Sequence, residues 1–196
     1  MSNYFTNFPL ISYNGVNVRD ILKRTNFIET NLSNPYVFLP YTVKDGEKPE
    51  DIAYNYYGSV DHTWLVVLAN AITDPYHEWP LSENLFGEYI MKKYAAESGK
   101  IGYDVIAWTQ NENLYENVKF YKTTTELGRT VLVSPDTFPL VYSEGIPIGR
   151  NVASGYEPYR IYDYERDIND SRREILVIDK QYYQQIIKEF KKLIKE

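Results

Sequence analysis

The chain of 196 residues contains no cysteine and only two histidines, His62 and His77. Without a thiol the protein has no disulfide, no thiolate metal site and no cysteine nucleophile, a composition that suits a reducing cytosol. Two isolated imidazoles provide neither an HExxH motif nor a paired-histidine ligand set. No apolar run approaches the roughly 20 residues that cross a bilayer. The first residues also lack the basic start and apolar centre of a signal peptide.

Basic residues are fewer than acidic residues, with 21 Lys and Arg against 27 Asp and Glu. The net charge of −6 argues against a broad nucleic-acid surface. The acidic cluster Asp45, Glu47, Glu50 and Asp51 fits neither a glycosidase carboxylate pair nor a calcium loop, and its place at a helix start explains it. Phosphate-binding glycine loops and a nucleophile elbow are missing as well. We therefore expect no enzymatic activity, metal or cofactor.

Aromatic residues, in contrast, are abundant: 20 Tyr, 8 Phe and 3 Trp. A hydrophobic share of 43% is typical of a globular protein. A chain of this length buries about 70% of its unfolded surface, enough for one core or two small ones. Amphipathic rings in this number can serve contact surfaces as well as cores.

The most readable stretch runs from residue 41 to residue 75. Tyr41-Thr42-Val43 is β-prone and leads into an Asp-Gly turn. Pro49 suits the first position of a helix, and Gly58 suits the C-cap of that helix. A second helix should end at Asn70, because Asp74-Pro75 stops any continuation. The pattern predicts one strand followed by two short amphipathic helices.

This stretch resembles a LysM module, in which a strand, two helices and a second strand follow one another. The matching residues are Tyr41, Val43, Gly46, Ile52, Ala53, Gly58, Leu65, Leu68 and Asn70. Two departures stand out: Gly46-Glu47-Lys48-Pro49 replaces the usual Gly-Asp-Thr-Leu, and an aromatic segment around Trp79 stands where the second strand should follow. With its flanks, the stretch is similar to the LysM-like baseplate wedge proteins of T4-type contractile-tailed bacteriophages.

The resemblance implies a structural virion protein located in the tail baseplate and assembled in the host cytoplasm. Such a wedge subunit binds other wedge proteins and helps to join neighbouring wedges into the hexagonal plate. The alternative is the usual LysM role, binding of peptidoglycan or another glycan, against which the departures and the single copy argue. The candidate partner-binding aromatic residues, for each of which core packing is the alternative, are Tyr54, Tyr57, Trp64, Tyr76 and Trp79.

The flanking segments complete an α+β prediction. Asn14-Gly15 between two β-prone runs predicts an N-terminal hairpin, with a short helix possible at 19–24. A helix should follow the N-cap Ser82, with Leu85, Phe86, Tyr89, Ile90 and Tyr94 on one face. Residues 99–155 contain β-prone pieces, such as 118–122 and 130–133, between turns.

The last forty residues are predicted to form a hairpin and a helix. Residues 156–165 alternate apolar with polar side chains, and residues 173–178 read as the return strand. Asp179 then caps an amphipathic helix whose basic face suits either a membrane surface or, as we prefer, docking on an acidic body. The expected division is an arm or hairpin packed on the module or a partner (1–40), a LysM-like module with an extra helix (41–98) and a β-rich region ending in an amphipathic helix (99–196).

Overall fold

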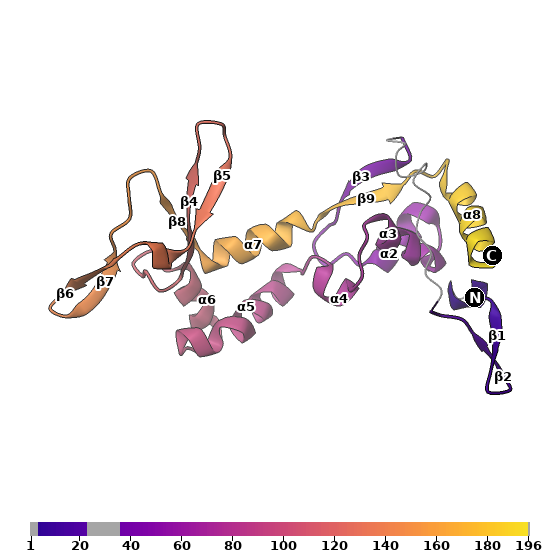
Figure 1. Cartoon of the computed structure of the whole chain (residues 1–196), viewed down its shortest axis with the longest axis horizontal. Helices are drawn as coiled ribbons and strands as arrows, with labels where there is room; N and C mark the ends of the chain where they lie inside the picture. Colours follow the sequence, from indigo (N-terminus) through magenta and orange to yellow (C-terminus); the bar gives the residue numbers. More distant parts are fainter. Residues whose placement is uncertain (1–3, 23–35, 196) are drawn as a thin grey trace. The chain divides into compact units, whose positions relative to one another are not determined.

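The computed structural model describes residues 4–22 and 36–195 as a mixed α+β protein (Figure 1). These residues form two compact units. Unit 1 combines Met1–Pro80 with Arg172–Glu196, and unit 2 is Leu81–Ser171. Unit 2 is therefore inserted into the sequence of unit 1. The segments expected from the sequence, 1–40, 41–98 and 99–196, divide the chain at other places.

Unit 1 begins with a short 3-10 helix and a two-stranded hairpin, continues with helices, and ends with a strand and a helix. Its hairpin turn is the predicted one, since Asn14 and Gly15 both have positive φ, as a type I′ turn requires. The possible helix at 19–24 lies partly outside the described residues. The elements of unit 1 are η1 (Tyr4–Asn7), β1 (Leu10–Tyr13), β2 (Val16–Arg19), β3 (Phe38–Thr42), α2 (Pro49–Tyr57), η2 (Val60–His62), α3 (Thr63–Ala69), α4 (Pro75–Glu78), β9 (Glu174–Ile178) and α8 (Tyr183–Lys195).

The ends of helix α2 follow the sequence signals closely. Pro49 occupies the first helical position, and the Asp51 carboxylate accepts a 3.0 Å hydrogen bond from the backbone N–H of Lys48. Gly58 closes the helix with φ of 81°, a left-handed conformation that glycine adopts without strain. Helix α3 ends at Ala69, as expected, but Pro75 then starts the one-turn helix α4, which the sequence reading missed.

Strand β3 pairs antiparallel with β9, and the register joins Phe38 to Ile178 and Thr42 to Glu174. The predicted hairpin of residues 156–165 with 173–178 is therefore wrong. The sequence reading did not find a second strand after Asn70, and the partner of β3 comes from beyond the inserted unit. One of the arguments against glycan binding thus no longer holds.

The outer edge of β9 is closed by side chains of two helices. Alternate residues of an antiparallel strand direct their backbone groups away from the partner strand. At Leu176 these groups are bound by Asn70, whose amide accepts from the N–H and donates to the carbonyl at 2.8 Å each. At Ile178 the Tyr57 hydroxyl accepts a hydrogen bond from the N–H at 2.9 Å and donates one to the carbonyl at 3.0 Å. On the other strand Pro40 lies opposite Leu176 and has no N–H to offer.

The core of unit 1 lies between this small sheet and helices α2, α3 and α8. Burying a large aliphatic side chain contributes about 1.5–3 kcal/mol, so this layer supplies the main stabilisation of unit 1. On α8 the buried residues Ile186, Phe190 and Ile194 recur at helical spacing, which confirms the predicted apolar face of that helix. The buried residues of this core are Val37, Val43, Ile52, Ala53, Tyr57, Leu65, Val66, Trp79, Ile175, Val177, Ile178 and Ile186.

Unit 2 starts with two helices and continues into a three-stranded sheet of order β5-β4-β8, a separate hairpin and a third helix. The Ser82 cap is confirmed, since its hydroxyl accepts from the N–H of Leu85. The buried residues of the helical core are Phe86, Ile90, Tyr94, Val105, Trp108, Ile161 and Tyr162. The elements are α5 (Glu83–Ser98), α6 (Tyr103–Gln110), β4 (Val118–Thr124), β5 (Thr130–Val133), η3 (Pro135–Thr137), β6 (Leu140–Ser143), β7 (Ile146–Arg150), β8 (Glu157–Arg160) and α7 (Ile161–Ser171).

Helix α7 replaces most of the strand predicted at 156–165. Its buried positions Ile161, Glu165 and Asn169 are four residues apart, and Tyr164 and Ile168 follow Ile161 at helical spacing. The sequence reading took the segment as alternating and so overlooked a helical pattern that was present. Helix α6 was also missed, because Gly102 at its N-cap provides no side-chain cap.

Candidate interaction surfaces

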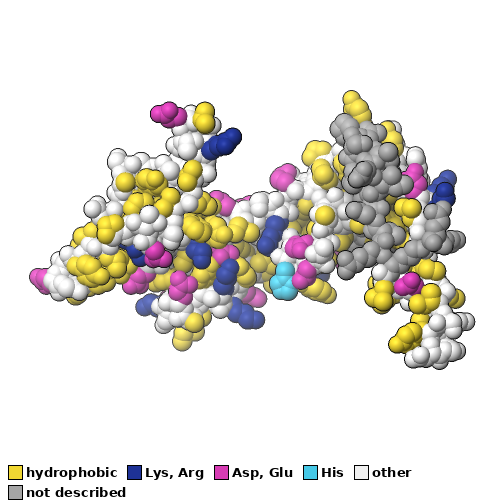
Figure 2. Space-filling model, in the orientation of Figure 1, with side chains coloured by type: hydrophobic (Ala, Val, Ile, Leu, Met, Phe, Trp, Pro, Cys, Tyr) yellow, Lys and Arg dark blue, Asp and Glu magenta, His cyan; other side chains and the backbone are white. Residues whose placement is uncertain are grey.

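The N-terminal hairpin β1–β2 exposes one apolar face. Ile11 pairs with Val18 and Tyr13 pairs with Val16, which places these four side chains on the same side of the two strands. Their exposed fractions lie between 38% and 66%. In Figure 2 apolar side chains are visible on this hairpin. A two-stranded hairpin is marginally stable by itself, so an uncovered apolar face of this kind marks a surface for contact.

The hairpin β6–β7 of unit 2 also exposes apolar side chains. Its two-residue turn is Glu144-Gly145, again with positive φ at both positions. The exposed apolar side chains are Val141, Tyr142, Ile146 and Ile148, with exposed fractions from 40% to 65%. The hairpin is joined to unit 2 by Arg150, which donates a 2.9 Å hydrogen bond to the carbonyl of Phe138. Both hairpins are therefore folded pieces that present apolar residues to solvent.

The five aromatic residues proposed from the sequence fall into three groups. Tyr54 and Tyr76 are 61% and 91% exposed. Trp64 is half-buried and stacks on Phe190 with ring centres 4.2 Å apart. Tyr57 and Trp79 are buried, and the Trp79 indole donates to the carbonyl of Glu47 at 2.8 Å. Binding of partners by these residues remains a prediction. Their exposure favours it for Tyr54 and Tyr76. Tyr57 and Trp79 instead pack in the core.

The two histidines have structural surroundings. The His62 ring packs edge-on against Tyr57 and Tyr183. His77 lies 2.6 Å from the Asp74 carboxylate, a contact that holds the pKa of this carboxyl below its usual range. Within residues 4–22 and 36–195, no group of three or more His, Cys, Asp or Glu side chains could hold a metal ion. These imidazoles therefore take part in packing and in a local cap.

The acidic cluster at the start of α2 is used for local hydrogen bonds. Glu47 accepts from the Tyr41 hydroxyl at 2.8 Å and from the backbone N–H of Lys44 at 3.0 Å. Burial, the hydrogen bond to Glu47 and the charge of Glu47 together raise the pKa of Tyr41 to about 12. Asp45 forms an ion pair of 3.4 Å with Arg173. The cluster thus fixes the loop that connects β3 to α2.

A buried polar cluster in unit 2 joins helices α5 and α7. The carboxylate of Glu165 accepts from the Tyr89 hydroxyl at 3.0 Å, the Lys93 amine at 2.7 Å and the Tyr94 hydroxyl at 2.5 Å. Burial by itself would raise the pKa of Glu165, but these three partners lower it below its usual value. Since both carboxylate oxygens are bound within the protein, the cluster positions helices and offers no free group for chemistry.

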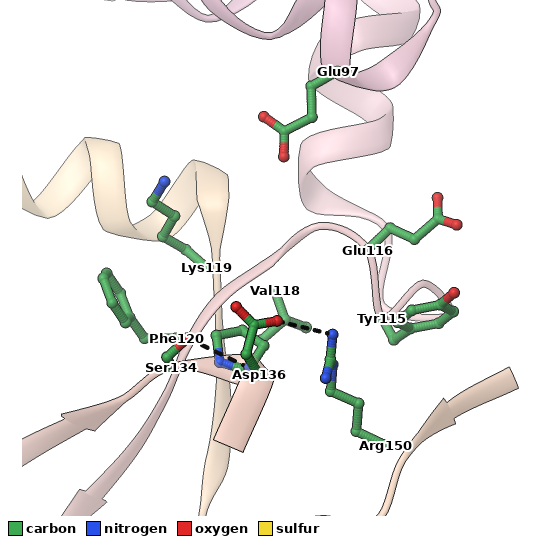
Figure 3. Close-up of a pocket in the computed structure, with 10 residues that line it drawn as sticks. Glu97, Tyr115, Glu116, Val118, Lys119, Phe120, Ser134, Asp136 and Arg150 are labelled. Atoms are coloured by element: carbon green, nitrogen blue, oxygen red, sulfur yellow. Dashed lines mark hydrogen bonds and ion pairs between the residues drawn. The ribbon is translucent and has the colours of Figure 1, made fainter. Parts of the chain in front are cut away.

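Unit 2 also contains a surface hollow of about 500 Å³ (Figure 3). The charged side chains of its wall are Glu97, Glu116, Lys119, Asp136 and Arg150. Asp136 and Arg150 form an ion pair of 3.4 Å across one side, and Figure 3 shows that the charged groups come from separate elements. The ion pair of Arg150 with Asp136 and its hydrogen bond to the carbonyl of Phe138 hold the hairpin and η3 in place, which is a structural role.

Comparison with known proteins identifies the family. The family model described as base plate wedge protein 53 matches residues 3–193. The chain belongs to this family. The baseplate wedge protein gp53 of Enterobacteria phage T4 is 28% identical over 153 residues, which cover 74% of this chain and 67% of the T4 protein. The family is one of structural proteins of the bacteriophage tail baseplate, as the sequence resemblance implied.

Members of the wedge family are parts of a larger particle, so surface contacts matter more than clefts. The sequence reading located the first hairpin but overlooked the second. Its signal was present in Glu144-Gly145 between apolar residues, but Pro147 within the second strand weakened the pattern. Among the described residues no helix is long and apolar enough to span a membrane.

Proposed function

We propose that this chain is a baseplate wedge subunit that binds other wedge proteins and helps to join adjacent wedges into the hexagonal tail baseplate. The observation that carries the proposal is the pair of folded hairpins with exposed apolar side chains. Each hairpin contributes an exposed tyrosine, Tyr13 or Tyr142, together with exposed aliphatic side chains. Tyrosine is enriched among the residues that dominate binding energy at interfaces.

Burial of these faces gives the expected driving force for assembly. Apolar area removed from water contributes roughly 25 cal/mol per Å² before the cost of association. One well-packed anchor typically accounts for about 2 kcal/mol or more of binding free energy. The hairpins belong to different units, so each unit contributes exposed apolar residues of its own. A subunit with exposed apolar residues on each unit is suited to joining neighbours, in a virion assembled in the host cytoplasm.

We further propose that β3, α2, α3 and β9 form a LysM-like module. The supporting features are the chain order of strand, two helices and strand, and the antiparallel pairing of the two strands. Asn70, which matches the asparagine at the end of the second LysM helix, binds the backbone of β9. Unit 2 would then be an insertion between the second helix and the second strand of this module.

The test is to mix the full-length chain with preformed wedge complexes and to measure sedimentation. We expect the chain to sediment with the wedges and wedge-to-wedge assembly to stall without it. Val16→Asp or Tyr142→Asp should weaken binding about thirtyfold, which corresponds to about 2 kcal/mol. The control is Tyr103→Asp, since Tyr103 is 81% exposed and lies outside both hairpins.

Two results would contradict the proposal. One is sedimentation with isolated peptidoglycan but not with wedge complexes. The other is a normal affinity of both hairpin variants for the wedges, which would locate the contact elsewhere on the chain. The same assay on Tyr54→Ala and Tyr76→Ala tests whether the two exposed aromatic residues are anchors.

A further inference from the structure

The N-terminal arm, defined as residues 4–22, is held together by its own hydrogen bonds. The Arg19 guanidinium donates to the carbonyls of Thr6 at 2.8 Å and Phe8 at 2.5 Å, so the second strand is tied back to η1. The N–H of Asp20 also donates to the carbonyl of Pro9 at 2.9 Å. The hairpin and η1 therefore form one small folded piece.

The arm inserts one phenylalanine into the rest of unit 1. Among its described side chains Phe8 alone is buried, at 4% exposed. It packs with Phe190 and Ile194 of α8, beside the ring of Trp64. We call Trp64, Phe190 and Ile194 the aromatic cleft. A cavity of about 40 Å³ lies against Trp64 and Phe190 and is also lined by Asn7 of the arm. Phe8 is thus the buried anchor, or plug, of the described arm.

The connection between the arm and the body is long in sequence. In the sequence, thirteen residues lie between Leu22 and Tyr36. Thirteen residues can span at most about 45 Å, so covalent geometry permits the arm to reach a neighbouring molecule. A second copy of the chain offers the same cleft with the same chemistry.

We propose that two copies of this chain exchange their N-terminal arms, so that Phe8 of each copy fills the aromatic cleft of the other. Reciprocal exchange preserves every contact within the arm and both cleft contacts, which makes it a low-cost route to a dimer. Exchange also brings two hairpins into one assembly, where the faces of Ile11, Tyr13, Val16 and Val18 can cover each other. This inference concerns the purified chain and does not depend on the proposed function.

Concentration decides between the closed monomer and the exchanged dimer. Because the arm is covalently joined to the chain that carries its own cleft, its effective concentration at that cleft is on the order of 1 mM. If only one arm is exchanged, the arm of the second copy must displace the cleft's own arm, which is present at this effective concentration. In the reciprocal dimer, however, the second arm binds within the same complex, and the covered hairpin faces add stabilisation that the monomer lacks.

The experiment uses the absence of cysteine, because a single introduced thiol can be labelled without background. One full-length chain carries a donor dye on the exposed position Ser12→Cys of the hairpin, and a second carries an acceptor dye on the exposed position Lys188→Cys of α8. We expect energy transfer between chains that rises with concentration and falls when excess unlabelled chain is added. Light scattering should then report twice the 23.0 kDa of one chain.

Variants of the plug make the test specific. Phe8→Ala in both chains should lower the apparent affinity about a hundredfold, since the buried ring is lost, while Phe8→Leu should retain most of the transfer. Leu22→Ala is the matched control, because Leu22 belongs to the arm and is 86% exposed. Its transfer should equal that of the unsubstituted chain.

Two outcomes overturn the proposal. The first is a mass of one chain and no transfer at any concentration up to about 1 mM. The second is equal transfer with Phe8→Ala, which would mean that chains associate through another surface. Circular dichroism of Phe8→Ala shows whether the body remains folded, and Phe8→Leu decides the matter if it does not.

Discussion

The protein contains two kinds of two-stranded sheet that differ in what surrounds them. The β3–β9 sheet lies over a core, and Asn70 and Tyr57 occupy the outward backbone groups of β9. The β1–β2 hairpin has the same number of strands, but every residue of both strands is exposed. The outward backbone groups of β9 are bound by side chains of the same chain, whereas the β1–β2 hairpin exposes an apolar face. Side-chain caps on a strand edge therefore distinguish a structural sheet from a contact sheet.

Truncating an isoleucine in each sheet should give the largest difference. Ile178→Ala should lower the free energy of unfolding by about 3 kcal/mol, because a fully buried side chain is replaced by a cavity. Ile11→Ala removes the same atoms from a side chain that is 43% exposed, and should change stability by less than about 0.5 kcal/mol. Urea unfolding at constant m-value measures both. Equal losses would mean that the hairpin is covered within the chain.

Removing one tyrosine hydroxyl from each sheet tests whether the side-chain caps on β9 contribute to stability. Tyr57→Phe leaves the N–H and carbonyl of Ile178 unpaired in a buried site and should cost about 2 kcal/mol. Tyr13→Phe is the control, and since Tyr13 is 66% exposed it should have no measurable effect. An unchanged melting temperature for Tyr57→Phe would show that the strand edge does not need its cap.

A glycine in left-handed backbone occurs in both regions, at Gly58 after α2 and at Gly15 in the hairpin turn. Neither would place a new Cβ against another atom, so alanine introduces only backbone strain, about 1 kcal/mol. Gly58→Ala should lower global stability by that amount. Gly15→Ala should instead raise hydrogen exchange in the hairpin while the unfolding midpoint stays unchanged. A shift of the midpoint by Gly15→Ala would indicate that the arm unfolds together with the core.

Alkaline pH should slightly lower the stability of the unit that contains the β3–β9 sheet. The pKa of Tyr41 is raised from 10.0 to about 12, by burial first and then by Glu47. This stabilisation is fully present below pH about 10 and is lost as the pH rises through about 12, because the unfolded phenol ionises first. Glu47→Gln should move the phenolate absorbance to lower pH and reduce this loss. Identical titrations of both proteins would contradict the assigned role of Glu47.

Local signals were sufficient for the elements that begin and end on particular residues. Asn14-Gly15 predicted the hairpin, and Pro49 with Gly58 predicted helix α2, because turn and cap chemistry depends on neighbours in sequence. The same reasoning could not pair β3 with β9, since Thr42 and Glu174 are 132 positions apart. The nearest candidate, residues 156–165, was chosen in error. Pairing between distant strands is set by packing of the whole unit.

The contact surfaces were predictable in part. The abundance of tyrosine pointed to interfaces, but sequence spacing did not separate Tyr54 and Tyr76, which are exposed, from Tyr57 and Trp79, which are buried. On a short helix one step of rotation moves a side chain from solvent to core. The burial of Tyr57 also depends on β9, which lies far along the chain. Exposure therefore required the tertiary structure.

The insertion of unit 2 between β3 and β9 sets an order of events during synthesis. The ribosome completes every residue of unit 2 before it delivers β9. Until then the Tyr57 hydroxyl and the Asn70 amide lack the backbone groups that they bind in the finished protein. The inserted unit can fold while the chain is still growing, whereas the surrounding unit must wait for its last strand. A nascent chain released before residue 174 would thus contain all of unit 2 but lack the last strand of unit 1.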